Sequence, residues 1–494
     1  MHSGTLISLS AYFILMLGIG VYAWRKSTAD SSGYLLGGRD LGPAVTALSA
    51  GASDMSGWLL MGLPGAIFLS GLSQAWIGIG LVIGAYFNYR LVAPRLRTYT
   101  ELANNAITVP DFLEERFEDK SHALRLISAL VIIVFFTLYT SAGMVAGGKF
   151  AVSAMGMDYT TGILLTAGIV VAYTALGGFL AVSLTDFVQG CIMFVALVMV
   201  PVAAYLVLGS DGLARGIAAA EASRGLSLSS LIGATSLVGI ISAAAWGLGY
   251  FGQPHIIVRF MAIRRVEDLP TARRINIGWM TVSLVGAIMT GYIGAAWLAQ
   301  RGGAPSDPET VFILLSQILF HPLVAGFTLA AILAAIMSTI SSQLLVTSSS
   351  LTEDIYKTYV RRDASERELV TTSRIAVAAV AVIAGLLALD PDSSILSLVG
   401  NAWAGFGAAF GPVILFALLW KRTTRTGALA GIVVGALVVI AWIVAGLGAT
   451  LYEIVPGFIA ASLATWLVSL ATPEPSQKVV ATFDAAAEAA RSGV

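Results

Sequence analysis

The chain has 494 residues, of which 57% are hydrophobic and only 11% are charged. Soluble globular domains carry about 25% charged residues, so this composition excludes a soluble fold and indicates an integral membrane protein. Basic and acidic residues number 28 each, and the resulting net charge of zero argues against a nucleic-acid partner. The single cysteine, Cys191, excludes a disulfide framework and a thiolate metal site.

Windows of about 20 apolar residues predict thirteen membrane-spanning helices. The first run lacks the basic n-region and the small-residue cleavage site of a signal peptide, so we expect it to be retained. The expected spans cover residues 6–24, 41–70, 73–93, 124–155, 160–178, 185–208, 230–258, 275–299, 321–350, 372–389, 395–420, 427–446 and 450–471.

The basic residues orient these helices. Of the 28, all except Lys149, Arg215, Arg224 and Arg301 lie on one side, in alternate connections starting with the first and in the tail. By the positive-inside rule that side is cytoplasmic. An odd number of spans then puts the N-terminus outside and the polar tail from residue 472 onward in the cytoplasm.

A carboxylate interrupts the second apolar run. Asp54 lies within residues 51–60, between flanks that otherwise have the character of one membrane span. A charge near the bilayer centre costs about 2.5–3.5 kcal/mol, and such residues mark polar or ionic pathways. Gly51 and Gly57 bracket Asp54, and small residues there let a helix unwind and expose carbonyl groups to a cavity. We therefore expect an interrupted helix that handles a polar species, with a cation as the leading candidate.

The seventh apolar run is interrupted as well. Residues 245–254 contain three glycines and a proline inside a stretch of membrane length. Five spans counted from each interruption give spans two to six and spans seven to eleven. The second set crosses the membrane in the opposite sense because five is odd. This pattern is typical of an inverted repeat, in which the binding site lies near the midplane of the membrane. The alternative is that the glycines only allow close helix packing.

The ninth apolar run offers neutral oxygen atoms to an ion. Ser338 and Thr339 are adjacent hydroxyls, and the Ala335 carbonyl lies one turn behind them. The unwound second span can add the carbonyls of Ala52 and Met55. Such an uncharged cage suits a monovalent cation, since a divalent ion usually takes carboxylates. The alternative is that the two hydroxyls merely bond to carbonyls of their own helix.

Two carboxylates accompany this predicted cage. Asp54 could bind the ion, hold the unwound segment or titrate as a proton carrier. Asp186 begins the sixth run and lies either on the ion path or at a helix N-terminus, where the helix dipole favours a carboxylate.

Aromatic side chains adjoin the second interruption. Trp246 and Tyr250 are four residues apart, and Tyr139 falls in the fourth run. Such rings can wall a small apolar ligand while their polar groups orient it. They can equally belong to the core or to an interfacial belt.

Five stretches carry a resemblance to a known family: residues 34–39 (Tyr-Leu-Leu-Gly-Gly-Arg), 47–65, 177–186, 247–260 and 331–354. With these residues the chain resembles the sodium:solute symporter family over nearly its whole length. The resemblance implies an all-α membrane fold with a LeuT-like core of two inverted five-helix repeats, each opening on a discontinuous helix. It implies a transporter, not an enzyme, that couples inward Na⁺ movement to uptake of L-proline by alternating access in a bacterial inner membrane.

The resemblance also implies a division of the chain, with membrane lipid around it and no obligatory protein partner evident. The expected parts are residues 1–40 (a peripheral span and a cytoplasmic loop), 41–208 (first repeat), 230–420 (second repeat), 427–471 (two peripheral spans) and 472–494 (a cytoplasmic tail).

By resemblance, Na⁺ is the coupling ion, and Asp54 is essential to its binding or to holding its site. Asp186 would lie along the inward ion route. The expected Na⁺ ligands are the carbonyls of Ala52, Met55 and Ala335 and the hydroxyls of Ser338 and Thr339. The expected proline pocket draws on Ser56, Gly57, Tyr139, Trp246, Tyr250 and Pro254.

Rival functions remain open on the sequence alone. The nearest is a Na⁺-coupled symporter of the same fold for another small amino or organic acid. A channel would need a continuous charged or carbonyl ring, usually from several subunits, whereas paired interruptions favour alternating access. A sensor would need a signalling domain after residue 472, and a membrane enzyme would need a catalytic set; neither is visible in the sequence.

Overall fold

A computed structural model describes residues 2–26, 31–301 and 305–492. Within these ranges the chain is helical and forms no β-strand; an isolated β-bridge joins Leu41 and Ile263. Residues 1 and 27–30 of the expected 1–40 segment, and residues 493–494 of the expected tail, lie outside the described residues.

The helices of the first half, with η marking 3₁₀ and π segments, are α1 (Ser3–Lys26), α2 (Ser31–Leu36), η1 (Gly37–Arg39), α3 (Pro43–Asp54), η2 (Trp58–Gly62), α4 (Leu63–Ser70), η3 (Gly71–Gln74), α5 (Ala75–Phe87), η4 (Asn88–Val92), α6 (Ala93–Leu102), α7 (Val109–Phe117), α8 (Ala123–Phe150), η5 (Ala151–Met155) and α9 (Tyr159–Arg224).

The helices of the second half are α10 (Leu237–Ala244), η6 (Ala245–Gly252), α11 (Pro254–Ala262), η7 (Val266–Asp268), α12 (Leu269–Arg301), η8 (Pro308–Thr310), α13 (Val311–Leu319), α14 (Pro322–Ser349), η9 (Ser350–Val360), α15 (Glu366–Leu387), α16 (Ile395–Leu419), α17 (Arg425–Val444), η10 (Leu447–Ala449), α18 (Ile454–Ala471) and α19 (Gln477–Ser492).

Among the described residues, ten helices are long and apolar enough to cross a membrane, where the sequence predicts thirteen spans. Two pairs of expected spans joined without a loop and one expected span divided into short helices account for the difference. α9 contains two expected spans, and the helical stretch 58–102 joins the end of one span to the next. The expected span 230–258 is divided into α10, η6 and α11, each shorter than a membrane crossing.

The first interruption follows α3. This helix begins with Pro43, whose missing N–H matters little in a first turn, and it ends at Asp54. Met55 has φ −85° and ψ 79°, so the chain leaves helical geometry there and regains it at η2. Gly51 lies inside α3, where a side chain would collide with Asn276 and Trp279 of α12. The backbone thus leaves helical geometry between the two glycines, as predicted, while Gly51 itself stays helical and allows close packing against α12.

The second interruption is a single extended residue. Gln253 has φ −82° and ψ 106° and separates the 3₁₀ segment η6 from α11, which begins at Pro254. The sequence predicts an interruption anywhere in residues 245–254. In the structure, residues 245–252 form the 3₁₀ segment η6, and only Gln253 has a non-helical backbone.

Gly178 divides the 66 residues of α9. Its φ of 56° and ψ of −148° break the helical geometry, and only glycine adopts such values without strain. A side chain at this position would also lie 2.6 Å from the carbonyl oxygen of Tyr34. The two expected spans, 160–178 and 185–208, thus meet at one glycine with no intervening loop.

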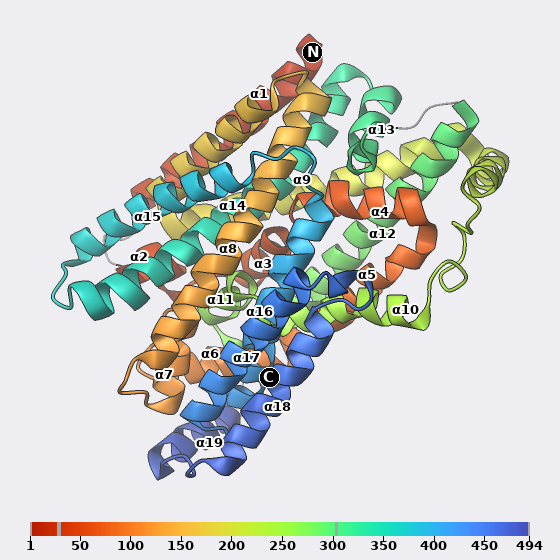
Figure 1. Cartoon of the computed structure of the whole chain (residues 1–494). Coiled ribbons are helices and arrows are strands. Elements are labelled where there is room, and N and C mark those ends of the chain that lie inside the picture. Colours follow the sequence, from red (N-terminus) through yellow and green to blue (C-terminus); the bar gives the residue numbers. More distant parts are fainter. Residues whose placement is uncertain (1, 27–30, 302–304, 493–494) are drawn as a thin grey trace.

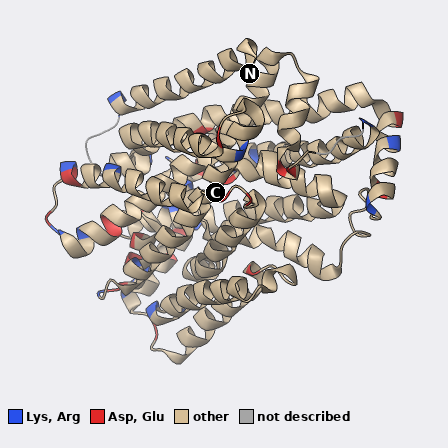
Figure 2. Ribbon diagram, turned by 45° about the horizontal axis from the view of Figure 1, so that its top comes forward, with Lys and Arg blue, Asp and Glu red and all other residues tan. Residues whose placement is uncertain are grey.

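The interrupted segments lie near the middle of the bundle. α3 packs against α9, α11, α12 and α14, while α11 packs against α3, α6 and α14. In Figure 1, α1 and α15 lie to one side of this centre, and α17 and α18 lie to the other. Figure 2 shows most charged residues at helix ends and connections, so the middle of the bundle is largely uncharged.

Glycines let the backbone of α5 touch the end of α10 and the segment η6. A side chain at Gly80 would lie 2.1 Å from the Ala244 carbonyl oxygen, and one at Gly84 would lie 2.1 Å from that of Gly247. Such contacts bring two helices closer than any larger residue allows. η6 is therefore held directly against α5.

Candidate functional site

The expected ion-binding hydroxyls meet the end of α3. Ser338 Oγ donates to the Ala52 carbonyl oxygen at 2.7 Å and to the Ala335 carbonyl oxygen at 3.1 Å. Thr339 Oγ1 lies 3.4 Å from the same Ala52 oxygen. Ala52, Ala335, Ser338 and Thr339 are at most 1% exposed. The structure therefore brings four of the five expected ligand residues together across 287 positions of sequence.

The interruption frees the carbonyls that this cluster uses. In a continuous helix the Ser56 N–H would bond to the Ala52 oxygen, but here it bonds to the Asp54 oxygen at 3.0 Å. Likewise the Leu59 N–H bonds to the Ser56 oxygen at 3.0 Å in place of the Met55 oxygen. The carbonyls of Ala52 and Met55, which the sequence analysis proposed as ion ligands, thus lose their helical N–H partners when α3 ends.

Asp54 connects the two interruptions. Its carboxylate, on a residue only 1% exposed, accepts a hydrogen bond from the Tyr250 hydroxyl through Oδ2. Its carbonyl oxygen accepts from Trp58 Nε1 at 3.2 Å and from the Tyr139 hydroxyl at 3.4 Å. Oδ1 is buried with no hydrogen-bond partner among the described residues. The carboxylate therefore orders the unwound segment from the side of η6.

Asp186 lies in a second buried cluster, towards the other end of α3. Its Oδ2 accepts from Ser49 Oγ at 2.7 Å, from Arg259 Nη2 at 3.1 Å and from Ser342 Oγ at 3.4 Å. Arg259 also donates to Ser49 at 3.1 Å and to Ser342 at 2.6 Å, and its guanidinium lies 5.3 Å from the Phe179 ring centre. One ion pair thus joins α3, α9, α11 and α14. Asp186 is fully buried inside α9, so its interpretation as an interfacial helix-end carboxylate is wrong.

Arg259 is the buried partner of Asp186 that the sequence interpretation missed, because it was counted among cytoplasmic loop residues. It is 0% exposed and lies in the second turn of α11. No local signal in the sequence separates it from a solvated arginine, because its burial depends on how α11 packs against its neighbours.

Aromatic rings surround the second interruption. The Trp246 ring lies 6.1 Å from Trp58 and stacks on Tyr452 at 5.4 Å with an interplanar angle of 21°. The ring of Trp403 lies 5.3 Å from that of Tyr250, and its Nε1 donates to the Trp246 carbonyl oxygen at 2.7 Å. Trp58, Trp403 and Tyr452 were not singled out from the sequence, since nothing local separates them from core residues.

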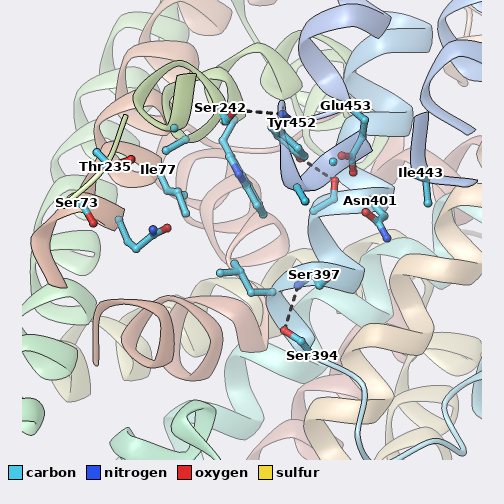
Figure 3. Close-up of a pocket in the computed structure, with 18 of the residues that line it drawn as sticks. Ser73, Ile77, Thr235, Ser242, Ser394, Ser397, Asn401, Ile443, Tyr452 and Glu453 are labelled. Carbon is cyan, nitrogen blue, oxygen red and sulfur yellow. Dashed lines mark hydrogen bonds between the residues drawn. The ribbon is translucent and has the colours of Figure 1, made fainter. Parts of the chain in front are cut away.

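The six expected substrate residues lie in or near the two interrupted segments. Tyr139 and Tyr250 both reach Asp54, and Ser56 and Gly57 belong to the first interruption itself. Gly57 has no room for a side chain, since one would lie 2.8 Å from the Ala146 methyl carbon. Trp246 also lines a cavity of about 640 Å³ (Figure 3) that none of the other five residues lines, and Pro254 begins α11.

The chemistry of the cluster at Ala52 favours a monovalent cation. Its oxygens are hydroxyls and carbonyls, and within the described residues no group of three or more His, Cys, Asp or Glu side chains is placed to hold a metal. Neutral oxygen ligands suit a weakly bound, singly charged ion, whereas a divalent ion usually requires carboxylates.

Comparisons with known proteins find relatives along almost the whole chain. A family model described as "Sodium:solute symporter family" matches residues 34–435. The "Osmoregulated proline transporter OpuE" of Bacillus subtilis is 57% identical and covers 96% of each chain. The "High-affinity proline transporter PutP" of the same organism is 58% identical and covers 95% of this chain and 98% of that protein. "Sodium/proline symporter 2" of Staphylococcus saprophyticus is 53% identical, covering 97% and 95% respectively.

Solved structures share the fold at low identity. A Na⁺-coupled sialic acid symporter in a substrate-bound outward-open state has a TM-score of 0.79 at 19% identity and covers 96% of this chain and 99% of that one. Mhp1, a nucleobase-cation-symport-1 family transporter in a closed conformation, has a TM-score of 0.56 at 16% identity, with 91% and 98% covered. These likenesses place the chain among LeuT-like helical membrane folds.

Proposed function

Because the chain belongs to the sodium:solute symporter family, we propose that it is a multi-pass membrane transporter that couples inward Na⁺ movement to uptake of L-proline. The relatives described above are named as proline transporters or as a sodium/proline symporter. The observation that carries the proposal is the meeting of the Ser338 and Thr339 hydroxyls with the freed carbonyl of Ala52.

Na⁺ is held by the carbonyls of Ala52, Met55 and Ala335 and the hydroxyls of Ser338 and Thr339. Ala52 lies in α3 and Met55 follows it directly, while the other three residues lie in α14, so the ion ties the interrupted helix to one of the two most buried long helices. Asp54 attracts the ion and orders the segment without being a required ligand. Its hydrogen bond from Tyr250 supports this role, because it directs one carboxylate oxygen towards η6.

Proline binds between the two interruptions. Ser56, Gly57, Tyr139, Trp246, Tyr250 and Pro254 contribute to its pocket. The contacts of Tyr139 and Tyr250 with Asp54 support a pocket beside the ion site, and in this proposal ordering of the α3 end by Na⁺ raises affinity for proline. By linkage, proline raises affinity for Na⁺ by the same factor.

Transport proceeds by alternating access. The core consists of two inverted repeats, 41–208 and 230–420, with peripheral segments 1–40 and 427–471, and the tail 472–494 is cytoplasmic. The chain crosses the bacterial inner membrane thirteen times with its N-terminus outside, surrounded by lipid and with no obligatory protein partner. An inside-negative membrane potential contributes about 2.3 kcal/mol per charge per 100 mV to inward Na⁺ movement. Asp186 and Arg259 lie on the inward ion route. For this route to open, the two side chains must either separate or move together as a pair.

Uptake of radiolabelled L-proline into proteoliposomes tests the function. An inward Na⁺ gradient should drive saturable accumulation, and its removal should abolish it. Unlabelled amino and organic acids added as competitors separate proline from another solute of the same class. Uptake that neither saturates nor follows the Na⁺ gradient would refute a symporter and favour a channel.

A further inference from the structure

Two tyrosine hydroxyls converge on the residue that precedes the proposed ion-binding hydroxyls. The Tyr173 hydroxyl of α9 donates to the Met337 carbonyl oxygen at 3.0 Å, and the Tyr12 hydroxyl of α1 donates to the Met337 sulfur at 3.6 Å. Met337 is 1% exposed and directly precedes Ser338 in α14. Two helices therefore hold α14 at a single residue beside its proposed ligands.

A buried glutamine fixes the Tyr12 hydroxyl. Gln189 Nε2 of α9 donates to this hydroxyl at 2.8 Å, and because the hydroxyl accepts that bond, its own proton is directed to the sulfur. Tyr12 is 4% exposed, and Gln189 and Tyr173 are 0% exposed. Buried polar groups are costly without hydrogen bonds, so these bonds keep both hydroxyls in one orientation.

The first helix, α1, is packed closely enough to act on α14. It lies along both α9 and α14. Ser8 Oγ donates to the Leu323 carbonyl oxygen at 2.7 Å, and an added Cβ at Gly326 would lie only 2.8 Å from the Ser8 Cβ. α1 is thus anchored at the start of α14, and Tyr12 makes a second contact about four helical turns further along.

The position of Met337 governs where the neighbouring hydroxyls point. Ser338 Oγ reaches the Ala52 carbonyl oxygen at 2.7 Å, and Thr339 Oγ1 lies 3.4 Å from the same atom. Consecutive residues of a helix move together, so a rotation of α14 at Met337 shifts both hydroxyls relative to α3. Binding groups must be held within about 0.5 Å of their productive geometry, so such a shift weakens an ion site.

We propose that Tyr12 and Tyr173 are positioning residues of the Na⁺ site. By holding Met337 they set the rotation of α14, which directs its two proposed ligand hydroxyls towards the Ala52 carbonyl. The inference rests on the proposed function, since it supplies the ion. It gives α1 a part in ion binding from outside the two proposed repeats.

Tyr12→Phe and Tyr173→Phe in the full-length protein, reconstituted in proteoliposomes, test the proposal. Each removes a hydroxyl and keeps the ring. The Na⁺ concentration for half-maximal proline uptake should rise about threefold to tenfold, the range expected for loss of one neutral hydrogen bond. The maximal rate and the proline KM at saturating Na⁺ should stay at wild-type values. Tyr34→Phe is the matched control, because the Tyr34 hydroxyl is also on a buried residue and donates to the Ala175 carbonyl oxygen at 3.0 Å.

Met337→Leu separates the contributions of the two tyrosines. It removes the sulfur that Tyr12 contacts and leaves the backbone carbonyl that Tyr173 contacts. Tyr12→Phe should therefore add little to the Na⁺ activation defect of Met337→Leu, whereas Tyr173→Phe should add its full effect.

Each other outcome decides the proposal. Wild-type Na⁺ activation in both tyrosine variants overturns it and leaves the proposed function standing. Equal losses of maximal rate, proline affinity and Na⁺ affinity, with a lowered melting temperature, would indicate a purely structural role and also overturn it. Wild-type protein without Na⁺-driven proline uptake refutes the proposed function and this inference with it. If Tyr173→Phe does not assemble, Tyr12→Phe and Met337→Leu replace it, and wild-type Na⁺ activation in both overturns the proposal.

Discussion

The hydroxyl of Tyr250 donates a hydrogen bond to the carboxylate of Asp54, and through this bond the 3₁₀ segment η6 contacts the end of the interrupted helix α3. The two residues are 196 positions apart in sequence. Each lies beside an interruption, so the bond couples the geometry of one interrupted segment to the other.

Tyr250→Phe removes the one hydrogen bond that Asp54 Oδ2 receives and leaves a buried carboxylate with less support. A hydrogen bond to a charged group contributes about 1.5–3 kcal/mol, so we expect the proline KM to rise by one to two orders of magnitude. Uptake in proteoliposomes measures this change. Tyr292→Phe is the control, since the Tyr292 hydroxyl bonds an exposed serine, Ser229. Equal effects of the two substitutions would contradict the role of Tyr250.

Thr339→Ala should weaken Na⁺ activation of uptake about tenfold or more, because it removes one proposed ligand at a cost of about 1.4 kcal/mol. Proline binding measured at fixed Na⁺ should weaken in parallel, as linkage requires. Thr347→Ala is matched in chemistry, helix and burial, but the Thr347 hydroxyl bonds to the Gln343 carbonyl of its own helix at 2.7 Å. A wild-type Na⁺ dependence in Thr339→Ala would show that the ion binds elsewhere.

Neutralising either partner of the Asp186–Arg259 pair should lower stability sharply. Asp186→Asn or Arg259→Gln leaves an uncompensated charge in the interior, which costs about 3–5 kcal/mol. The double variant should lose less than the sum of the two, and a double-mutant cycle on the apparent melting temperature in nanodiscs measures this coupling.

Arg264→Gln is the control for the Asp186–Arg259 pair, since the Arg264 side chain is 49% exposed and pairs with Asp268 at the surface. Exposed pairs contribute about 0–1 kcal/mol, so little change is expected. Additive losses in the Asp186 and Arg259 cycle would argue that the two side chains act independently.

Gly178→Ala should destabilise the protein strongly, because the substitution combines a positive φ with a collision against Tyr34. Gly209→Ala separates the two causes, since Gly209 of the same helix has a similar backbone conformation, with φ 70° and ψ 169°, but has no atoms within 4 Å of an added Cβ. The control should lose only the backbone term of about 1–3 kcal/mol. Thermal unfolding of both purified variants makes the comparison, and similar losses would rule out the Tyr34 contact as a cause.

The local features of the site could be predicted from the sequence. Asp54 and the glycines beside it indicated an interrupted helix, and the adjacent hydroxyls of Ser338 and Thr339 indicated neutral ligands. The structure brings these hydroxyls to the Ala52 carbonyl, because the end of α3 releases that group from its helix. Backbone carbonyls carry no sequence signal of their own, so Ala52 and Met55 became candidates only through the interruption beside them.

Pairings between distant buried polar groups could not be predicted in the same way. Arg259 has the sequence context of a cytoplasmic loop residue, yet it lies 3.1 Å from Asp186, which is 73 positions earlier. Nothing in its neighbourhood along the chain distinguishes a solvated arginine from a buried one, because burial depends on how α11 packs against α3 and α9.

The backbone contacts of Gly80 and Gly84 with η6 restrict which parts of the protein can move separately. Two helices whose backbones touch cannot slide or tilt apart without leaving an empty space between them. We therefore expect α5 and η6 to move as one rigid body. The extended residue Gln253, directly after η6, is then the point about which α11 can pivot. Motion of α11 relative to η6 would rearrange the contacts of α11 with α3, α6 and α14 while the glycine contact keeps α5 and η6 together.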